Sequence, residues 1–264
     1  MCKTIFVGAR KGGVGKTMTV ASLGVGLARQ GKRTLIIDTD SQHSLTISLG
    51  IQNPDRLPAT IASIMMDIIN ERDFDPANGI IRHTEGVDLL PSNSSLTGIE
   101  LTLAPLIGRE TVLRQYIEKV SPLYDYILID TPPSLDLLTI NALAAADSVI
   151  IPIVPKILDA KGLELLLKSI AQIRRQINPK LAVDGILLTM VDRRSNLTRA
   201  VISSIENAYG GGIQIFSEYI PQSVRAAETS GQGVSIFKHD PRGKVAAAYE
   251  SLVKEVLDCG LLGR

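Results

Sequence analysis

A glycine-rich run near the start of the chain carries the strongest chemical signal in the sequence. Residues 8–17 read Gly-Ala-Arg-Lys-Gly-Gly-Val-Gly-Lys-Thr and follow directly after a short apolar segment. Glycines let several backbone N–H groups converge on phosphate oxygens, and a helix beginning there presents further free N–H groups to the same anion. The run therefore predicts a phosphate-binding loop. Its expected ligand-contacting residues are Lys11, Gly12, Gly13, Val14, Gly15, Lys16, Thr17 and Met18.

Two side chains at the end of this run have the chemistry to handle a nucleoside triphosphate. Lys16 would reach the β- and γ-phosphates, and the hydroxyl of Thr17 would bind Mg²⁺. The usual pattern is glycine, four residues, then Gly-Lys-Ser/Thr, and here Arg10 stands at the first glycine position. A glycine-rich strand-to-helix turn without a ligand is the alternative, but the Lys-Thr pair and its place before a helix favour phosphate binding.

Three aspartates follow or end apolar runs that read as buried strands. Asp38 and Asp40 come at the end of one run, and Asp130 ends another. Open α/β sheets bind ligands at the carboxyl ends of their strands, so these carboxylates are expected near the phosphate loop. Together with the phosphate loop, the three carboxylates favour metal and water chemistry, in which Asp38 and Asp40 would share the tasks of orienting water and holding the metal shell. Taken alone, any one of them could be a helix N-cap or a turn residue.

The elements that must position these residues alternate between short β-rich runs and longer stretches of helical period. Strands are expected at residues 4–9, 33–38, 87–91, 126–130, 148–152 and 183–190. Helices are expected at residues 16–30, 110–120, 135–146, 160–176, 197–209 and 243–257. This alternation predicts an α/β fold with a mostly parallel sheet. Residues 52–94 are the least regular and are expected to decorate one end of the sheet.

Composition limits the class of protein. The 264 residues carry 28 Lys+Arg against 27 Asp+Glu, a net charge of +1, and are 45% hydrophobic, which excludes intrinsic disorder. Two cysteines, Cys2 and Cys259, cannot form a disulfide scaffold and suggest a reducing compartment. No secretory signal or membrane-spanning run is evident. The balanced charge argues against a wholesale electrostatic nucleic-acid binder, and we expect one domain over residues 1–264.

Residues 11–17 resemble the deviant Walker A motif of the ParA/MinD ATPases, in which the first lysine is the signature. Further segments resemble that family in the same order along the chain: residues 38–42, 124–134, 188–194, 220–225 and 240–242. The most similar branch is the ParA/Soj chromosome- and plasmid-partition ATPases. The resemblance implies a doubly wound, mostly parallel sheet flanked by helices, of the P-loop NTPase class, with ATP and Mg²⁺ as cofactors.

The resemblance also implies roles for individual residues. Lys11 is expected to reach across a dimer interface to the partner's nucleotide, and Lys16 to bind the phosphates of its own. Asp40 is expected to position the attacking water, with Asp38 helping through the metal or the switch region. The metal-binding set implied is Thr17, Asp38 and Asp130. A guanine signature is absent, and the family places adenine near Met190, Asp192 and Pro221.

The same family implies what the nucleotide controls. ATP would join two subunits into a sandwich homodimer that binds DNA without sequence specificity, and hydrolysis would release it. Arg194 and Arg225 correspond to DNA-binding arginines, although scattered basic residues by themselves would read as a solvated surface. A ParB-type centromere-binding protein is the expected partner that stimulates hydrolysis. The implied location is cytoplasmic and nucleoid-associated.

Two alternatives stay open. A MinD-like membrane-cycling ATPase needs a basic amphipathic C-terminal helix, but residues 252–264 hold two acids, two bases and interrupting glycines. This tail reads better as a final helix packed on the core, so no stable membrane association is expected. A nucleotide-locked binding protein with little turnover is the other alternative, because Arg10, Met18 and Ser41 depart from the family pattern. An iron–sulfur reductase of the same superfamily is not expected, because its interface cysteines have no counterpart here. With Lys11 ten residues from the start, we do not expect an N-terminal operator-reading extension either.

Overall fold

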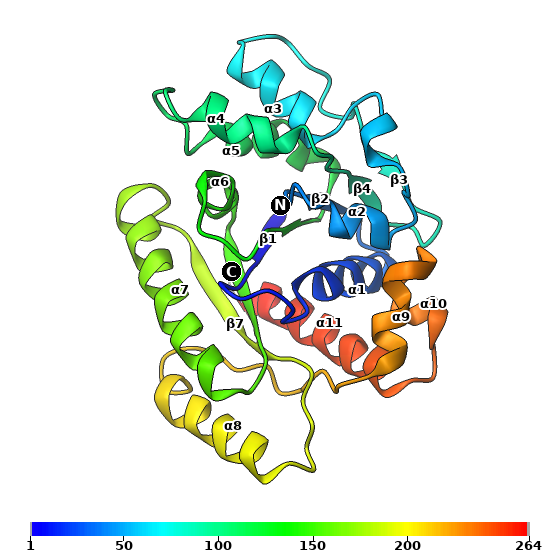
Figure 1. Cartoon of the computed structure of the whole chain (residues 1–264), viewed down its shortest axis with the longest axis vertical. Helices are drawn as coiled ribbons and strands as arrows, with labels where there is room; N and C mark the ends of the chain where they lie inside the picture. Colours follow the sequence, from blue (N-terminus) through cyan, green and yellow to red (C-terminus); the bar gives the residue numbers. More distant parts are fainter. Residues whose placement is uncertain (1, 263–264) are drawn as a thin grey trace.

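A seven-stranded sheet forms the centre of the molecule. The computed structural model describes the backbone of residues 2–262 and the side chains of residues 2–156 and 161–258. Within these residues the strands lie in the order β3-β4-β2-β5-β1-β6-β7 (Figure 1). Their bounds are β1 Lys3–Val7, β2 Thr34–Asp38, β3 Ile81–Arg82, β4 Asp88–Leu90, β5 Tyr126–Asp130, β6 Ser148–Ile153 and β7 Ala182–Leu188. β3 pairs antiparallel with β4 at one edge, and the other pairings described are parallel.

Helices cover both faces of this sheet, as a sheet built from parallel crossovers requires (Figure 1). The α-helices are α1 Lys16–Arg29, α2 Ser44–Ser48, α3 Ile61–Ile69, α4 Leu96–Leu103, α5 Val112–Val120, α6 Leu137–Ala145, α7 Ile157–Gln176, α8 Asn196–Tyr209, α9 Val224–Gln232, α10 Ile236–His239 and α11 Lys244–Leu262. Short 3₁₀ turns lie at Pro54–Arg56 and Ser121–Leu123. None of the described helices is long and apolar enough to cross a membrane.

Alternate residues along the central strands feed two separate cores. Ile5 and Leu128 pack with the helices α1 and α11 on one face, whereas Phe6 and Ile129 pack with helices α3 to α8 on the other. Successive strand side chains point to opposite faces, so a strand buried on both sides must be apolar throughout. The structure confirms the predicted α/β fold with a doubly wound, mostly parallel sheet.

The segment at residues 52–94 is more than the decoration that the sequence led us to expect. Helix α3 buries Ile61, Ile64 and Met65 in the larger core, and β4 joins the sheet beside β2. The helix escaped prediction because most of its residues are apolar, which hides the helical period. A signal was present in the capping box, in which the side chains of Thr60 and Ser63 satisfy backbone groups at the helix start.

The register of the parallel strands brings the chemical groups of the sequence to one edge. Val7 pairs with Asp130, and Asp130 also pairs with Asp38, so β1, β5 and β2 end side by side. β1 lies between β5 and β6, and the chain crosses from one side of β1 to the other between those two strands. Ligands of open α/β sheets bind at such a crossing, beyond the carboxyl ends of the strands.

Candidate active site

The glycine-rich loop joins β1 to α1 and leaves the start of that helix uncapped. Gly13 and Gly15 have φ angles of 71° and 84°, in the left-handed region where a side chain would be strained. Gly15 is the N-cap residue of α1, and no side chain accepts a hydrogen bond from the first turn. The hydroxyl of Thr189 donates to the Val14 carbonyl over 2.8 Å and ties the loop to the end of β7. The loop is therefore held in place with its helix N-terminus open to an anion.

Lys16 is buried beneath this loop, with 7% of its surface exposed. Its Nζ lies 3.4 Å from the Lys11 carbonyl, a long contact for a cation. Burial lowers the pKa of Lys16, and the nearby carboxylates of Asp130 and Asp40 oppose that shift. A buried ammonium with one weak hydrogen bond is under-satisfied, and phosphate oxygens would supply the missing acceptors.

Asp130 presents an oxygen that the protein leaves without a partner. Its Oδ2 accepts a hydrogen bond from the Thr17 hydroxyl over 2.8 Å, while its buried Oδ1 has no hydrogen-bond donor among the described residues. Burial, with a further contribution from Asp38, raises the pKa of Asp130 to about 8. Mg²⁺ prefers oxygen ligands and uses one or two carboxylates together with substrate phosphates. A hydroxyl and an orphaned carboxylate oxygen beside a phosphate loop fit that ion.

Asp38 and Asp40 occupy the next strand end, but their oxygens are used differently. The Oδ2 of Asp38 accepts from the Thr46 hydroxyl and N–H over 2.7 and 2.9 Å, and its Oδ1 accepts from the Asp40 N–H. Burial raises the pKa of Asp38 to about 6. Both of its oxygens are thus engaged within the chain, and direct metal binding by Asp38 stays a prediction. Asp40 is only half-buried, and its Oδ1 accepts from the Gln42 N–H.

A cleft of about 400 Å³ opens beside the loop and gathers most of the residues expected to hold the base. Met18, Met190 and Pro221 line it together with Gly13, Gly15, Lys16 and Thr17. The sequence analysis missed further lining residues because they lie on helices α9 and α11, far along the chain. Those residues are Ala226, Ala227, Ser230, Val245 and Tyr249.

Asp192 is not among the residues that line this cleft, and its expected place near the base stays a prediction. It lines a neighbouring hollow of about 710 Å³ beyond Pro221 and Gln222. Its Oδ1 accepts the N–H of Arg194 over 3.0 Å, closing the turn that leads into α8. This turn directs the Asp192 carboxylate toward the adjacent hollow.

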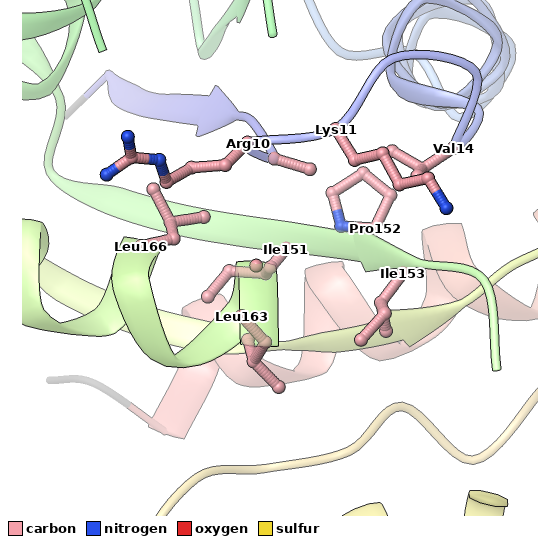
Figure 2. Close-up of a pocket in the computed structure, with 10 residues that line it drawn as sticks. Arg10, Lys11, Val14, Ile151, Pro152, Ile153, Leu163 and Leu166 are labelled. Atoms are coloured by element: carbon pink, nitrogen blue, oxygen red, sulfur yellow. The ribbon is translucent and has the colours of Figure 1, made fainter. Parts of the chain in front are cut away.

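The side chains of Arg10 and Lys11, at the start of the loop, point in opposite directions. Figure 2 shows Arg10 extending over Leu166 of α7 and Lys11 extending in the opposite direction, past Val14 and Pro152. Both side chains are exposed, and a small apolar cavity of about 20 Å³ lies beneath them. Arg10, which replaces the first glycine of the usual pattern, turns away from Lys11 (Figure 2), and Gly13 and Gly15 keep the left-handed backbone of the loop.

The arginines expected to face DNA are exposed, and one of them is paired. Arg225, on the first turn of α9, lies 3.8 Å from Asp240. Arg193 lies 3.9 Å from Glu218 and stacks on the ring of Tyr219, whereas its neighbour Arg194 is exposed at the rim of the hollow. Exposed ion pairs of this kind contribute little stability, so a competing phosphate can displace the carboxylate.

Comparison with known proteins places this geometry in a family. Residues 2–183 match the family described as AAA domain. The sporulation initiation inhibitor protein Soj of Bacillus subtilis is 40% identical over 256 residues, which cover 97% of this chain and 98% of that protein. The chromosome partitioning protein ParA of Caulobacter vibrioides is 33% identical over 257 residues, covering 97% and 94%.

A solved structure shows the same arrangement over the whole chain. Cobyrinic acid a,c-diamide synthase from Mycobacterium smegmatis, with bound ADP and magnesium, superposes with a TM-score of 0.86. It is 33% identical to this chain, and the match covers 100% of this chain and 97% of that one. The same protein has also been solved with an ATP analogue and magnesium.

Proposed function

Because this chain belongs to the ParA/Soj family of P-loop partition ATPases, we propose that it is an ATP-driven DNA segregation protein. Mg²⁺ and ATP bind at the loop, the loaded protein forms a sandwich homodimer that holds DNA without sequence specificity, and hydrolysis releases it. One observation carries the nucleotide site: the Thr17 hydroxyl and an unpartnered oxygen of Asp130 lie together at the start of α1.

Each residue of the site has a task in this proposal. Backbone N–H groups of residues 12–17 and the buried Lys16 bind the phosphates, and Thr17 with Asp130 holds the metal. When bound, Mg²⁺ neutralises charge that develops on the phosphate oxygens. Asp40 orients the water that attacks the γ-phosphate. Lys11 supplies a cation to the partner's nucleotide, which makes hydrolysis depend on dimerisation.

Sedimentation tests the coupling between nucleotide and dimer. We expect an Asp40→Ala variant to bind ATP without hydrolysing it and therefore to accumulate as a dimer in ATP and Mg²⁺. A Lys16→Ala variant, which loses the phosphate contact, should sediment as a monomer in the same buffer. If the Asp40→Ala variant stays monomeric with ATP and Mg²⁺, the sandwich dimer is wrong.

The DNA-binding part of the proposal is supported by where α9 lies. The helix carries Arg225 at its exposed start, and its residues Ala226 and Ala227 line the nucleotide cleft. Helix α9 therefore lines the cleft proposed for the base and also carries one arginine of the proposed DNA surface. Because the monomer carries a charge of only +1, a dimer that doubles the phosphate contacts should bind DNA far better. A ParB-type protein is the proposed activator of hydrolysis, and the nucleoid is the proposed location.

The membrane-cycling alternative is less well supported by the packing of the last helix. In α11 the apolar residues Tyr249, Leu252 and Val253 are buried in the core shared with α1, as expected for a helix docked on the fold. Residues 263 and 264 of the tail, and the Cys259 side chain, lie outside the described part of the chain. ATPase activity measured with and without duplex DNA separates the partition function from a nucleotide-locked binding protein, which would show little turnover in either condition.

A further inference from the structure

Two buried hydroxyls, those of Thr46 and Ser92, form hydrogen bonds with Asp38 and Asp40 at the end of β2. The Thr46 hydroxyl donates to Asp38 Oδ2 over 2.7 Å and accepts the Ser92 N–H over 3.0 Å. The Ser92 hydroxyl donates to the carbonyl oxygen of Asp40 over 2.8 Å. Asp38, Thr46 and Ser92 are all fully buried. A continuous chain of hydrogen bonds therefore runs from Asp38 through α2 to the end of β4 and back to Asp40.

This series of hydrogen bonds fixes the backbone of Asp40 through both its N–H and its carbonyl group. Its N–H donates to Asp38 Oδ1, and its carbonyl accepts from the Ser92 hydroxyl and from the His43 N–H. Within the described part of the chain, the Asp40 side chain accepts only a local hydrogen bond, from the Gln42 N–H. The position of its carboxylate is thus set by a backbone that the two hydroxyls hold in place, while the carboxylate itself stays half-buried at the site.

Ser92 is in turn braced by the segment that the sequence suggested was peripheral. The Pro91 carbonyl accepts the Ile61 N–H at the start of α3, and the Thr60 hydroxyl donates to the neighbouring Asn93. Helix α3 is anchored in the larger core through Ile61 and Ile64. The loop after β4 therefore transmits the rigidity of that core to the backbone of Asp40.

We propose that Thr46 and Ser92 are positioning residues for hydrolysis, holding the Asp38–Asp40 turn so that Asp40 presents its carboxylate to the attacking water. This inference rests on the proposed function, in which Asp40 orients that water. Neither hydroxyl lines the cleft beside the loop, so their removal should impair the chemical step and leave nucleotide binding largely intact.

Steady-state kinetics with ATP and Mg²⁺ tests the inference. Ser92→Ala removes one buried hydrogen bond and Thr46→Val removes two. Each variant should lower kcat about tenfold or more, with KM for ATP changing less than about twofold. Thr46→Ser keeps the hydroxyl and should restore kcat to within about threefold of the unmodified protein. Ser48→Ala is the matched control, because Ser48 lies on the same helix and donates only to Leu45. Unchanged kcat in Ser92→Ala and Thr46→Val would overturn the inference.

Hydrogen–deuterium exchange over residues 40–46 gives a second readout that needs no turnover. The N–H groups of Asp40 and Thr46 both donate to Asp38, so their exchange reports on the turn. With ADP and Mg²⁺ bound, Ser92→Ala and Thr46→Val should speed exchange there, and Ser48→Ala should not. If all variants exchange alike, the inference is wrong even where kcat falls. If the unmodified protein hydrolyses no ATP yet the exchange differs as expected, the proposed hydrolysis fails and the positioning stands.

Discussion

At the scale of single residues, Lys16, Asp38 and Asp130 are three ionisable groups with less than a tenth of their surface exposed. Within the part of the chain that the structure describes, the Lys16 ammonium makes one long hydrogen bond, and one carboxylate oxygen of Asp130 has no donor. Buried polar groups without partners cost free energy, and a ligand that supplies the partners recovers it. The site is therefore less stable empty than loaded, and nucleotide with Mg²⁺ should stabilise the whole fold.

The Asp130→Asn variant separates the contribution of Asp130 to metal binding from its contribution to the stability of the fold. In EDTA at pH 8 we expect its thermal midpoint to be no lower than that of the unmodified protein, because a neutral amide replaces a carboxyl whose charged form is penalised by burial. In ATP with Mg²⁺, the unmodified protein should gain about 2.7 kcal/mol at a hundred times the Kd. In the same ATP and Mg²⁺ buffer, the Asp130→Asn variant should gain only the stability that ATP alone gives in EDTA. A full Mg²⁺-dependent gain in the variant would remove Asp130 from the metal site.

Cys2 offers a pH-dependent test at the opposite end of the sheet. Burial, with smaller contributions from Asp147 and Asp125, raises the pKa of this thiol from 9.0 to about 12. Only the thiolate reacts with iodoacetamide, so at pH 8 native Cys2 should react about a thousandfold more slowly than the same residue in urea. The measurement uses a Cys259→Ser background. Comparable rates in the native and unfolded protein would contradict the assigned burial.

At the scale of elements, the packing of α1 explains how the phosphate loop is held. Helix α1 carries Lys16 and Thr17 at its start and lies against α11 through a close approach at Gly26. A Cβ built on Gly26 would lie 2.5 Å from Val253 Cγ2 and 3.4 Å from the ring of Phe237. Gly26 thus sets the distance between α1 and α11, and through it the position of α1 on the sheet.

Gly26→Ala should therefore destabilise the protein although alanine is the better helix former. The overpacking cost of about 1 to 3 kcal/mol exceeds the gain in helix propensity of up to about 1 kcal/mol. Gly98→Ala on α4 is the matched control, since a Cβ there meets nothing within 4 Å, and it should be neutral or stabilising. Urea denaturation measures both. Adding Val253→Ala to the Gly26→Ala variant should recover part of the loss, and no recovery would place the strain elsewhere.

The sequence predicted most elements because their signals are local. β5 was predicted with its observed bounds, and α1 and β2 within one residue at either end. Helices α2, α4, α9 and α10 were missed because they are short or weakly periodic, and tertiary packing rather than propensity stabilises them. The antiparallel edge strand β3 has only two residues, too few for a period to register.

At the scale of the whole molecule, a net charge of +1 makes the proposed DNA binding depend on where the arginines lie. Arg194 is exposed beside the hollow near Pro221, and Arg225 must exchange Asp240 for a phosphate. An interaction built from few contacts should weaken steeply with salt, by a slope of about 0.9 in log K per phosphate contacted. Such weak binding suits a complex that must form and dissolve with each nucleotide cycle.

Charge reversal tests this surface. Arg194→Glu and Arg225→Glu should each weaken ATP-dependent binding of duplex DNA about tenfold or more and reduce the salt slope by about 1. Arg72→Glu, which makes the same charge change just beyond α3, should bind as the unmodified protein does. ATP binding measured in parallel should be unchanged in all three. Equal DNA retardation by the two variants and the control would show that DNA, if bound, uses another face.

The sequence by itself determined the phosphate loop, the parallel α/β fold and the strand-end placement of Asp38, Asp40 and Asp130. The loop follows from the backbone conformations that its glycines allow, and the fold follows from the hydrophobic periodicity of short segments. Both are set by residues that are neighbours in the sequence. Only the tertiary structure decided that Asp192 faces a second hollow and that Thr46 and Ser92 hold the Asp38–Asp40 turn. Ser92 lies 52 residues from Asp40 along the chain, and strand order brings them together. Contacts of that kind depend on how the layers pack, and no local pattern in the sequence records them.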